Sequence, residues 1–203
     1  MLFKQFARVR TAEGHEVGHL GRVVVRPDTR EITHLVIHQG LLFTEDKVVP
    51  LEFVDQATEA QIVLSRAAGD LKTLPPFEER QDIFDDAAPP DRTLAELAGR
   101  PATYPAAPGP RLLTRLERNL PVDTVALKGS AKIVTADGRY AGALESVAAA
   151  PDTRQITHLE IASGLLAREY RLIPIAWVVI LGEDEIHLSV DRKTLTAIRP
   201  HLN

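Results

Sequence analysis

The sequence predicts an all-β protein made of two similar small domains, and an internal repeat is the first observation that supports this prediction. Residues 7–76 align without a gap on residues 131–200, at a constant offset of 124. Within residues 11–65, 25 of the 55 aligned positions are identical, which indicates that one structural unit was duplicated. In both copies, glycine, proline or aspartate separates short apolar or alternating runs roughly every ten residues, a pattern typical of a β-sandwich or small barrel.

A glycine turn joins the first two predicted strands of each copy. In the first copy the strands are expected at residues 6–10 and 17–25, and Glu13-Gly14 between them favours a type I′ hairpin, in which both central residues have positive φ. Gly18, inside the second strand, indicates a bulge or a sharp bend. The second copy has its equivalent strands at residues 131–135 and 140–149, its turn at Asp137-Gly138 and its strand glycine at Gly142.

The third strand shows which face of the sheet is the core. It follows a turn at residues 27–30, where proline presets φ and aspartate can bond to the backbone. Along residues 31–39 the side chains should alternate between two faces. The second copy keeps Leu35 and Ile37 but replaces Val36 with glutamate, so the leucine and isoleucine face is expected to be the core. The outer face is expected to carry Ile32, His34 and Val36.

The rest of each copy reads as two more strands and a short tail. In the first copy Pro50 indicates a barrel corner or a short 3₁₀ turn, and Phe53 is expected to fill the core after it. The last strand is expected at residues 62–65, and a tail at residues 71–76 could form one turn of helix. The second copy places these features at Pro174, Trp177, residues 186–189 and residues 195–200.

The segment between the copies, residues 77–125, differs in kind. Nine of the fourteen prolines lie between Pro75 and Pro121, so most of this connector should be extended and stiffened by proline. One short helix is expected at residues 91–99, between an aspartate cap and a glycine stop. The C-terminal third of the connector carries several apolar residues, and we expect it to dock on one of the two domains.

The turn, strand and proline pattern of both copies resembles the PRC-barrel family. In the first copy the resemblance is carried by Gly14, Gly18, Pro27-Asp28, Ile32-Thr33-His34-Leu35, Gly40 and Pro50, and in the second by their partners at the offset of 124. It covers about two thirds of the chain. The resemblance implies two tandem small, mostly antiparallel β-barrels at residues 1–76 and 126–203, joined by the proline-rich connector at residues 77–125 with at most one short helix.

The family includes the cytoplasmic domain of the photosynthetic reaction centre H subunit and the C-terminal domain of a ribosome maturation factor. Members of known role mostly bind protein partners, and the resemblance implies no catalytic residues. The sequence shows neither the membrane helix of the first protein nor the separate N-terminal domain of the second, so neither specific role can be transferred. The resemblance implies a non-enzymatic bacterial protein-interaction or assembly module with an unidentified protein partner.

The amino-acid composition excludes several classes of function and of cellular location. The absence of cysteine excludes disulfides, thiolate catalysis and cysteine-ligated metal centres. Residues 1–6 do not resemble a signal peptide, and the longest apolar stretch, residues 172–181, is about half of a membrane span and aligns with a core strand. A cytoplasmic protein without a membrane span is therefore expected. A net charge of −4 and an aromatic content of 5% argue against nucleic acid as the partner.

Histidine is the only residue class that invites a chemical interpretation. His34 and His158 recur on the expected outer faces and could face each other, although a strand-surface hydrogen bond explains each of them more simply. His19, His34 and His38 could bind a metal ion in the first domain, yet the second copy has alanine at two of these three positions. We therefore predict no catalytic, cofactor-binding or metal-binding residues, no cofactor and no enzyme.

Two groups of charged residues also have a simpler structural explanation. Asp28 with Arg30, and Asp152 with Arg154, could be a catalytic acid beside an anion clamp, but both pairs lie in tight turns whose residue types the backbone already explains. An acidic patch in the connector lacks the glycine and the spacing of a calcium loop and is expected to be a solvated face. The patch consists of Glu78, Glu79, Asp82, Asp85 and Asp86.

One difference between the copies suggests a contact. The sequence Val24-Val25-Arg26 becomes alanine at residues 148–150, and this loss of volume in a strand indicates that another segment approaches it closely. We expect the connector or the first domain to pack there, which would leave residues 23–26 as the freer edge and a candidate surface for a partner. Two other functions stay open, an RNA- or ribosome-associated factor and a metal- or small-ligand-binding protein, as does homo-oligomerisation.

Overall fold

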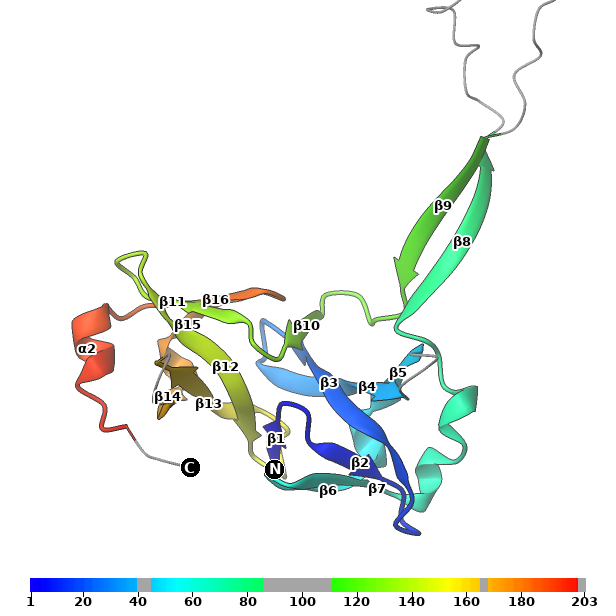
Figure 1. Cartoon of the computed structure of the whole chain (residues 1–203), viewed down its shortest axis with the longest axis horizontal. Helices are drawn as coiled ribbons and strands as arrows, with labels where there is room; N and C mark the ends of the chain where they lie inside the picture. Colours follow the sequence, from blue (N-terminus) through cyan, green and yellow to red (C-terminus); the bar gives the residue numbers. More distant parts are fainter. Residues whose placement is uncertain (40–44, 86–110, 165–167, 201–203) are drawn as a thin grey trace, which may run out of the picture. The chain divides into compact units, whose positions relative to one another are not determined.

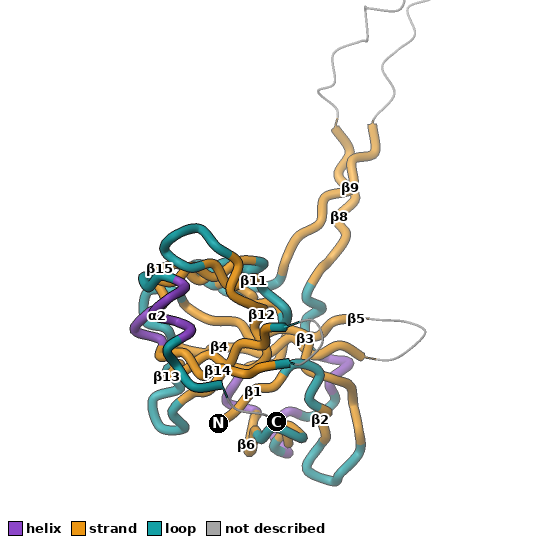
Figure 2. Tube along the Cα trace, turned by 60° about the vertical axis from the view of Figure 1, so that its left-hand side comes forward, coloured by secondary structure: helices purple, strands orange, loops and turns teal. Residues whose placement is uncertain are grey.

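The computed structural model describes residues 1–39, 45–85, 111–164 and 168–200 of the chain. It divides into two compact units, one of residues 1–77 with 119–203 and one of residues 78–118. The second unit contains a two-stranded antiparallel hairpin, β8 (Glu78–Asp85) and β9 (Arg111–Arg118). The first unit contains both copies of the repeat. It is mostly β, as the sequence predicts, and strands make up most of the trace in Figure 2.

Each copy of the repeat forms its own mixed sheet. The sheet of the first copy has the order β5-β4-β3-β2-β7-β6, in which β2 and β7 are parallel and the other neighbours antiparallel. Its strands are β2 (Arg8–Arg10), β3 (Glu16–Arg26), β4 (Glu31–Gln39), β5 (Glu45–Pro50), β6 (Val54–Ala57) and β7 (Gln61–Leu64). Hydrogen bonds do not close this path into a ring, so the expected barrel is an open sheet by this criterion.

The second copy repeats this topology in the order β14-β13-β12-β11-β16-β15, with β11 and β16 parallel. Its strands are β11 (Lys132–Val134), β12 (Tyr140–Ala149), β13 (Ile156–Ser163), β14 (Glu169–Pro174), β15 (Val178–Leu181) and β16 (Glu185–Leu188). This sheet is not closed by hydrogen bonds either. The predicted short 3₁₀ turns after Pro50 and Pro174 are confirmed as η1 (Leu51–Phe53) and η4 (Ile175–Trp177).

Short helical turns complete the described chain. The first copy ends in η2 (Arg66–Ala68) and η3 (Leu71–Thr73), and the second in the five-residue helix α2 (Arg192–Thr196). Asp191 caps α2 by accepting a hydrogen bond from the backbone N of Thr194 at 2.8 Å. The helix expected at residues 91–99 lies outside the described residues, and none of the described helices has the length and apolar character needed to cross a membrane.

The two copies exchange their first strands. β1 (Leu2–Lys4) pairs with β12 of the second copy, and β10 (Val125–Lys128) pairs with β3 of the first. The registers are the same at the offset of 124, because Leu2 lies opposite Ala148 and Ala126 lies opposite Val24. Figure 1 shows β1, in dark blue, beside β12, in yellow-green. Each sheet is therefore completed by a strand that belongs, by sequence, to the other copy.

A pseudo-twofold axis relates the two copies. The backbone N of Ile32 donates to the carbonyl of Arg154 at 3.0 Å, and the backbone N of Ile156 donates to the carbonyl of Arg30 at 2.9 Å. A small cavity of about 20 Å³ lies between the sheets, and its lining residues form pairs at the same offset, such as Phe3 with Leu127. One continuous hydrophobic core contains buried residues of both copies. A single copy of this size would bury little apolar surface. The shared core therefore supplies buried apolar surface that neither copy has alone.

Bulges change the expected assignment of faces on β4. Leu35 and Ile37 are fully buried in the main core, as predicted. Ile32 is in the same core, although simple alternation placed it on the outer face with His34. The reason is a register shift that leaves Thr33 without a cross-strand partner between β3 and β4, so the alternation is reset. The same shift occurs at Thr157 in the second copy.

The hairpins predicted at Gly14 and Gly138 are confirmed, but their turns are not of type I′. Gly14 and Gly138 have positive φ, but Glu13 and Asp137 do not, whereas a type I′ turn requires positive φ at both central residues. In the first hairpin the backbone N of Thr11 donates to the carbonyl of His15, which closes a longer loop with glycine as its left-handed residue. A Glu-Gly or Asp-Gly pair is compatible with a type I′ turn and with this longer loop, so the pair alone does not distinguish them.

Part of the outer face of the first sheet is buried, contrary to prediction, whereas His38 on the same face stays exposed. Val36 and Val48 form a second apolar cluster with Phe77 from the start of the connector and Ala126 from β10. Leu120 packs against the same cluster, so both ends of the connector cover this part of the face. The expected docking of the connector's C-terminal third is thus found for its last residues, whereas β9 belongs to the second unit.

The contact expected at the alanine segment of β12 is present. Met1 and Ala149 exchange hydrogen bonds, from the N-terminal amine to the carbonyl at 2.8 Å and from the amide of Ala149 to Met1 at 2.9 Å. The segment that approaches is β1 of the first copy. The converse expectation, that residues 23–26 form a free edge, is wrong, because β10 pairs with them and Val24 is fully buried. Nothing in the local sequence revealed that the exchange is reciprocal.

Candidate functional site

His34 and His158 are not brought together. His34 lies opposite Val24 and Pro50 in its own sheet, and His158 lies opposite Ala148 in the other. Within the described chain no hydrogen bond or ion pair joins the two side chains. The Nδ1 atom of His34 is buried and has no hydrogen-bond partner among the described residues, so it does not make the surface hydrogen bond expected for it. Burial lowers the pKa of His34, and the Glu52 carboxylate opposes this only in part.

The lowered pKa of His34 predicts a loss of stability in acid. The unfolded chain should bind a proton near the ordinary histidine pKa of 6.5, whereas the folded chain resists protonation at this site, so the free energy of unfolding falls as pH decreases below that value. Replacing His34→Gln should remove this dependence. Urea unfolding of both proteins between pH 8 and pH 5 should give parallel stabilities above about pH 7 and a steeper decline for the wild type below it. Curves that stay parallel down to pH 5 would contradict this account.

The proposed three-histidine metal site is not assembled. His34 and His38 are four residues apart on β4, which places their Cα atoms about 13 Å from each other. Across the described residues, no three histidine, aspartate or glutamate side chains are positioned to hold one metal ion. His19 and His38, however, are direct cross-strand partners on β3 and β4, and His38 is in turn the partner of Asp46 on β5. We call His19, His38 and Asp46 the histidine row.

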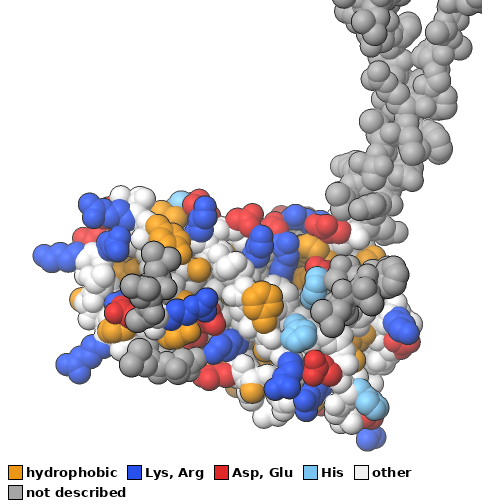
Figure 3. All heavy atoms as spheres, in the orientation of Figure 1, with side chains coloured by type: hydrophobic (Ala, Val, Ile, Leu, Met, Phe, Trp, Pro, Cys, Tyr) orange, Lys and Arg blue, Asp and Glu red, His pale blue; other side chains and the backbone are white. Residues whose placement is uncertain are grey.

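The histidine row is exposed and partly ordered by a carboxylate. The Nδ1 atom of His38 lies 2.5 Å from the Oδ1 atom of Asp46, while the Nε2 atom of His19 lies 3.9 Å from Glu16. Both imidazoles are about half-exposed. Figure 3 shows histidine side chains gathered on one face of the molecule, beside basic and acidic residues. This face is therefore polar.

The Asp28 and Arg30 pair is part of a turn. Arg30 and its partner Arg154 both have φ of 59°, and their carbonyls accept the hydrogen bonds that join the two copies. The guanidinium of Arg30 donates to the carbonyl of Val178 at 3.1 Å. The carboxylate of Asp28 accepts from the backbone N of Thr29 at 2.7 Å. These groups hold the turn and the junction, which is the structural role expected for them.

The acidic patch of the connector lies mostly in β8. Its first four members are within Glu78–Asp85, and Asp86 lies outside the described residues. Glu78 forms an ion pair with Arg118, between the Oε1 and Nε atoms at 3.4 Å. The structure does not describe the side chains of Glu79, Asp82 and Asp85, so the solvated face expected for the patch stays a prediction.

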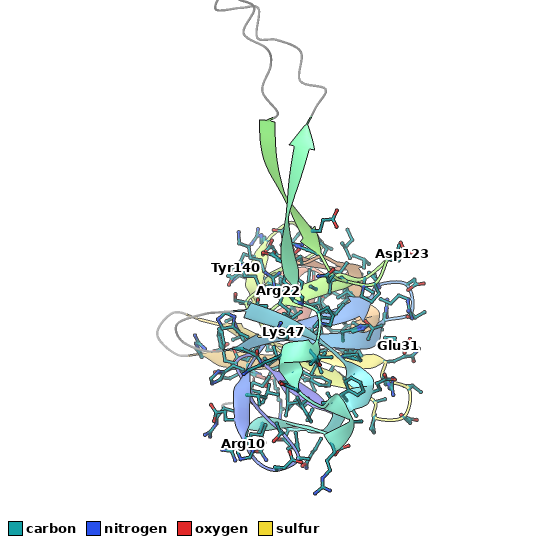
Figure 4. The ribbon with its side chains drawn as sticks, turned by 90° about the vertical axis from the view of Figure 1, so that its right-hand side faces the viewer. Arg10, Arg22, Glu31, Lys47, Asp123 and Tyr140 are labelled. Carbon is teal, nitrogen blue, oxygen red and sulfur yellow. The ribbon has the colours of Figure 1, made fainter. Side chains whose placement is uncertain are left out.

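A large depression in the described surface is a groove lined by residues of the second copy together with Gln5 and Phe6. It encloses about 710 Å³, is open to solvent and has two exposed aromatic rings at its margin, Phe6 (68% exposed) and Tyr140 (58% exposed). In Figure 4, Tyr140 lies near the rim of the first unit, while Arg22 and Lys47 lie closer to its middle. The groove, which we call the aromatic groove, is further lined by Ala143, Ala162, Gly164, Glu145 and Arg168.

The aromatic groove exists because the two copies differ at equivalent positions. Ala143 and Ala162, which line it, align with His19 and His38, and Tyr140 aligns with Glu16. Small side chains thus leave a hollow where the first copy has the histidine row. Phe6 has φ of 57°, an uncommon conformation for a bulky residue, and its ring is mostly exposed. Ser130, the equivalent residue of the second copy, has φ of 75°, so the left-handed backbone belongs to the repeat and the exposed ring is what distinguishes Phe6.

A second apolar surface lies on β15, at the end of the second sheet. Val179 and Ile180 are exposed there, whereas the equivalent residues of β6 are Asp55 and Gln56. A depression of about 200 Å³ beside them is lined by residues of β15 and by the turn that contains Arg30. Polar residues are the usual protection of an edge strand, and β15 lacks them.

Sequence reasoning missed these surfaces. Neither Phe6 nor Tyr140 was a predicted site residue, although the change from glutamate at position 16 to tyrosine at position 140 was visible in the alignment of the copies. Comparison with protein-family models and with curated proteins yields no match for this chain.

Proposed function

We propose that the chain is a tandem PRC-barrel-like, non-enzymatic interaction module that binds a protein partner through the aromatic groove. The observation that carries this proposal is the pair of exposed rings, Phe6 and Tyr140, at the margin of an open groove. The turn and strand pattern shared with the PRC-barrel family supports it, because members of that family with a known role mostly bind proteins. Cytoplasmic location is part of the same proposal.

The lining of the groove suits an extended peptide. Aromatic side chains supply large apolar contact areas at low entropic cost, and they are enriched where proteins bind one another. Glu145 and Arg168, with 3.9 Å between their Oε2 and Nη1 atoms, add one charge of each sign. A partner that places an apolar side chain between the rings could also meet these charges.

RNA is the alternative that the same experiment must separate. Bases stack on aromatic side chains, but single-stranded nucleic acid also requires a basic track for its phosphates. The charges lining the aromatic groove are one arginine and one glutamate, and the whole chain has a net charge of −4. The charges therefore favour a protein partner.

Site-specific photocrosslinking tests the proposal. A benzophenone amino acid at position 140 should crosslink to a protein partner in the native cells, whereas the same probe at position 16, the equivalent position of the first copy, should not. Tyr140→Glu and Phe6→Ser each introduce the residue found at the equivalent position of the other copy. Either substitution should reduce partner capture at least tenfold. Glu16→Gln serves as the control and should leave capture unchanged.

The outcomes separate the candidate functions. A protein adduct that survives ribonuclease and depends on Phe6 supports the proposal. An adduct lost on ribonuclease treatment would indicate that the groove binds RNA instead of a protein. Equal adducts at positions 140 and 16, or none at either, would show that the aromatic groove is not the binding surface.

A further inference from the structure

We propose that the histidine row of the first copy binds one divalent transition-metal ion, of the class of Zn²⁺, Ni²⁺ or Cu²⁺, with His19 and His38 as its two protein ligands. This inference is independent of the aromatic groove and of any protein partner. Imidazole nitrogens are preferred ligands of these ions, and water can fill the remaining coordination positions.

The strand register brings the two imidazoles together. His19 and His38 are directly opposite each other on the antiparallel strands β3 and β4. Side chains of such partners lie on the same face of the sheet, with Cβ atoms about 5 Å apart. Two imidazoles that start from this separation can reach a common ion, since each metal–nitrogen bond is about 2.0–2.1 Å long.

Asp46 prepares His38 for this role. Its carboxylate lies 2.5 Å from the Nδ1 atom of His38, so the neutral imidazole carries its proton on Nδ1 and leaves Nε2 as the free lone pair. Metal-binding histidines commonly donate their other N–H group to a carboxylate, which fixes the ring and raises its basicity. The row therefore contains two ligands and an orienting group on three adjacent strands.

The second copy contains the corresponding negative control. The positions of His19, His38 and Asp46 are occupied there by Ala143, Ala162 and Tyr170, in the same cross-strand register. Ala143 and Ala162 are partly exposed, so two histidines can be introduced at this site. If strand register creates the metal site, grafting the histidines should create a second one.

Titration of the full chain with zinc chloride at pH 7.5, followed by calorimetry, tests this inference. The wild type should bind one equivalent, and His19→Ala or His38→Ala alone should each weaken the affinity at least tenfold. Asp46→Asn should weaken it less. His187→Ala is the matched control: His187 also lies beside a carboxylate, with 3.4 Å between its Nε2 atom and Glu185, but its cross-strand neighbours are Val134 and Ile180.

The graft Ala143→His with Ala162→His should bind a second equivalent of zinc. Because metal binding requires deprotonated imidazole, the wild-type affinity should also fall at pH 5.5. Circular dichroism melting before each titration confirms that a variant is folded. Absence of zinc binding by the wild type, or full binding retained in the folded His19→Ala or His38→Ala protein, would overturn the inference. Equal loss in the His187→Ala control would show that the binding is not specific to the histidine row.

Discussion

Replacing Phe3→Ala is expected to lower the free energy of unfolding by about 4 kcal/mol, because the ring is almost fully buried and its removal leaves a cavity in the shared core. Phe3 lies on β1, whose partner is β12 of the other copy. The loss should therefore affect both sheets together and appear as one cooperative transition at lower denaturant concentration. Chemical denaturation followed by circular dichroism and by the fluorescence of Trp177, which lies in the second copy, measures the two signals.

Leu2→Ala is the control for this prediction. Leu2 is the neighbour of Phe3 on the same strand, but it is only partly buried, so its truncation should cost less than half as much. Two separate transitions in the wild type, or a Phe3→Ala change that affects only one signal, would show that the two sheets do not share one cooperative core.

Gly142→Ala is expected to destabilise the protein by about 3 kcal/mol, since the new methyl group would meet backbone that cannot move aside. A Cβ atom at this position would lie 2.5 Å from the carbonyl oxygen of Ala162, and Gly142 has φ of 146°. Its partner Gly18 makes the same close approach to the carbonyl of His38. Thermal unfolding of Gly142→Ala should show the loss as a lower Tm.

Gly138→Ala separates the two causes of this loss. Gly138 also has positive φ, at 74°, but a Cβ atom there would meet nothing within 4 Å. Its substitution should therefore cost about 1 kcal/mol, the penalty of the left-handed backbone alone. If both substitutions lower the Tm equally, the close approach between β12 and β13 contributes nothing.

The reciprocal exchange of β1 and β10 explains why the duplication persists as one body within the first unit. Each exchanged strand inserts a fully buried side chain, Phe3 or Leu127, into the common core. Neither copy can be removed without taking a strand from the other sheet. The equivalent faces of the sheets are then free to diverge, and they carry the histidine row in one copy and the aromatic groove in the other.

Local signals in the sequence are sufficient to predict a mostly-β chain with two repeated domains, but not that each domain is an open mixed sheet. The repeat, the alternation of Leu35 and Ile37, and the glycine and proline positions are local signals, and the structure confirms the strands and the 3₁₀ turns that they predict but not the type I′ turns. The sequence also predicted a close approach to the alanine segment of β12, because lost volume in a strand must be compensated nearby.

Only the tertiary structure decided which segment makes that approach and which faces remain exposed. Phe77 and β10 bury the part of the outer face of the first sheet around Val36 through contacts between residues far apart in the chain. Bulges at Thr33 and Thr157 reset the side-chain alternation. Periodicity describes neighbours along one strand, so it carries no information on such contacts. The aromatic groove is lined by Gln5 and Phe6 together with residues of the second copy, so no local pattern within one copy predicts it.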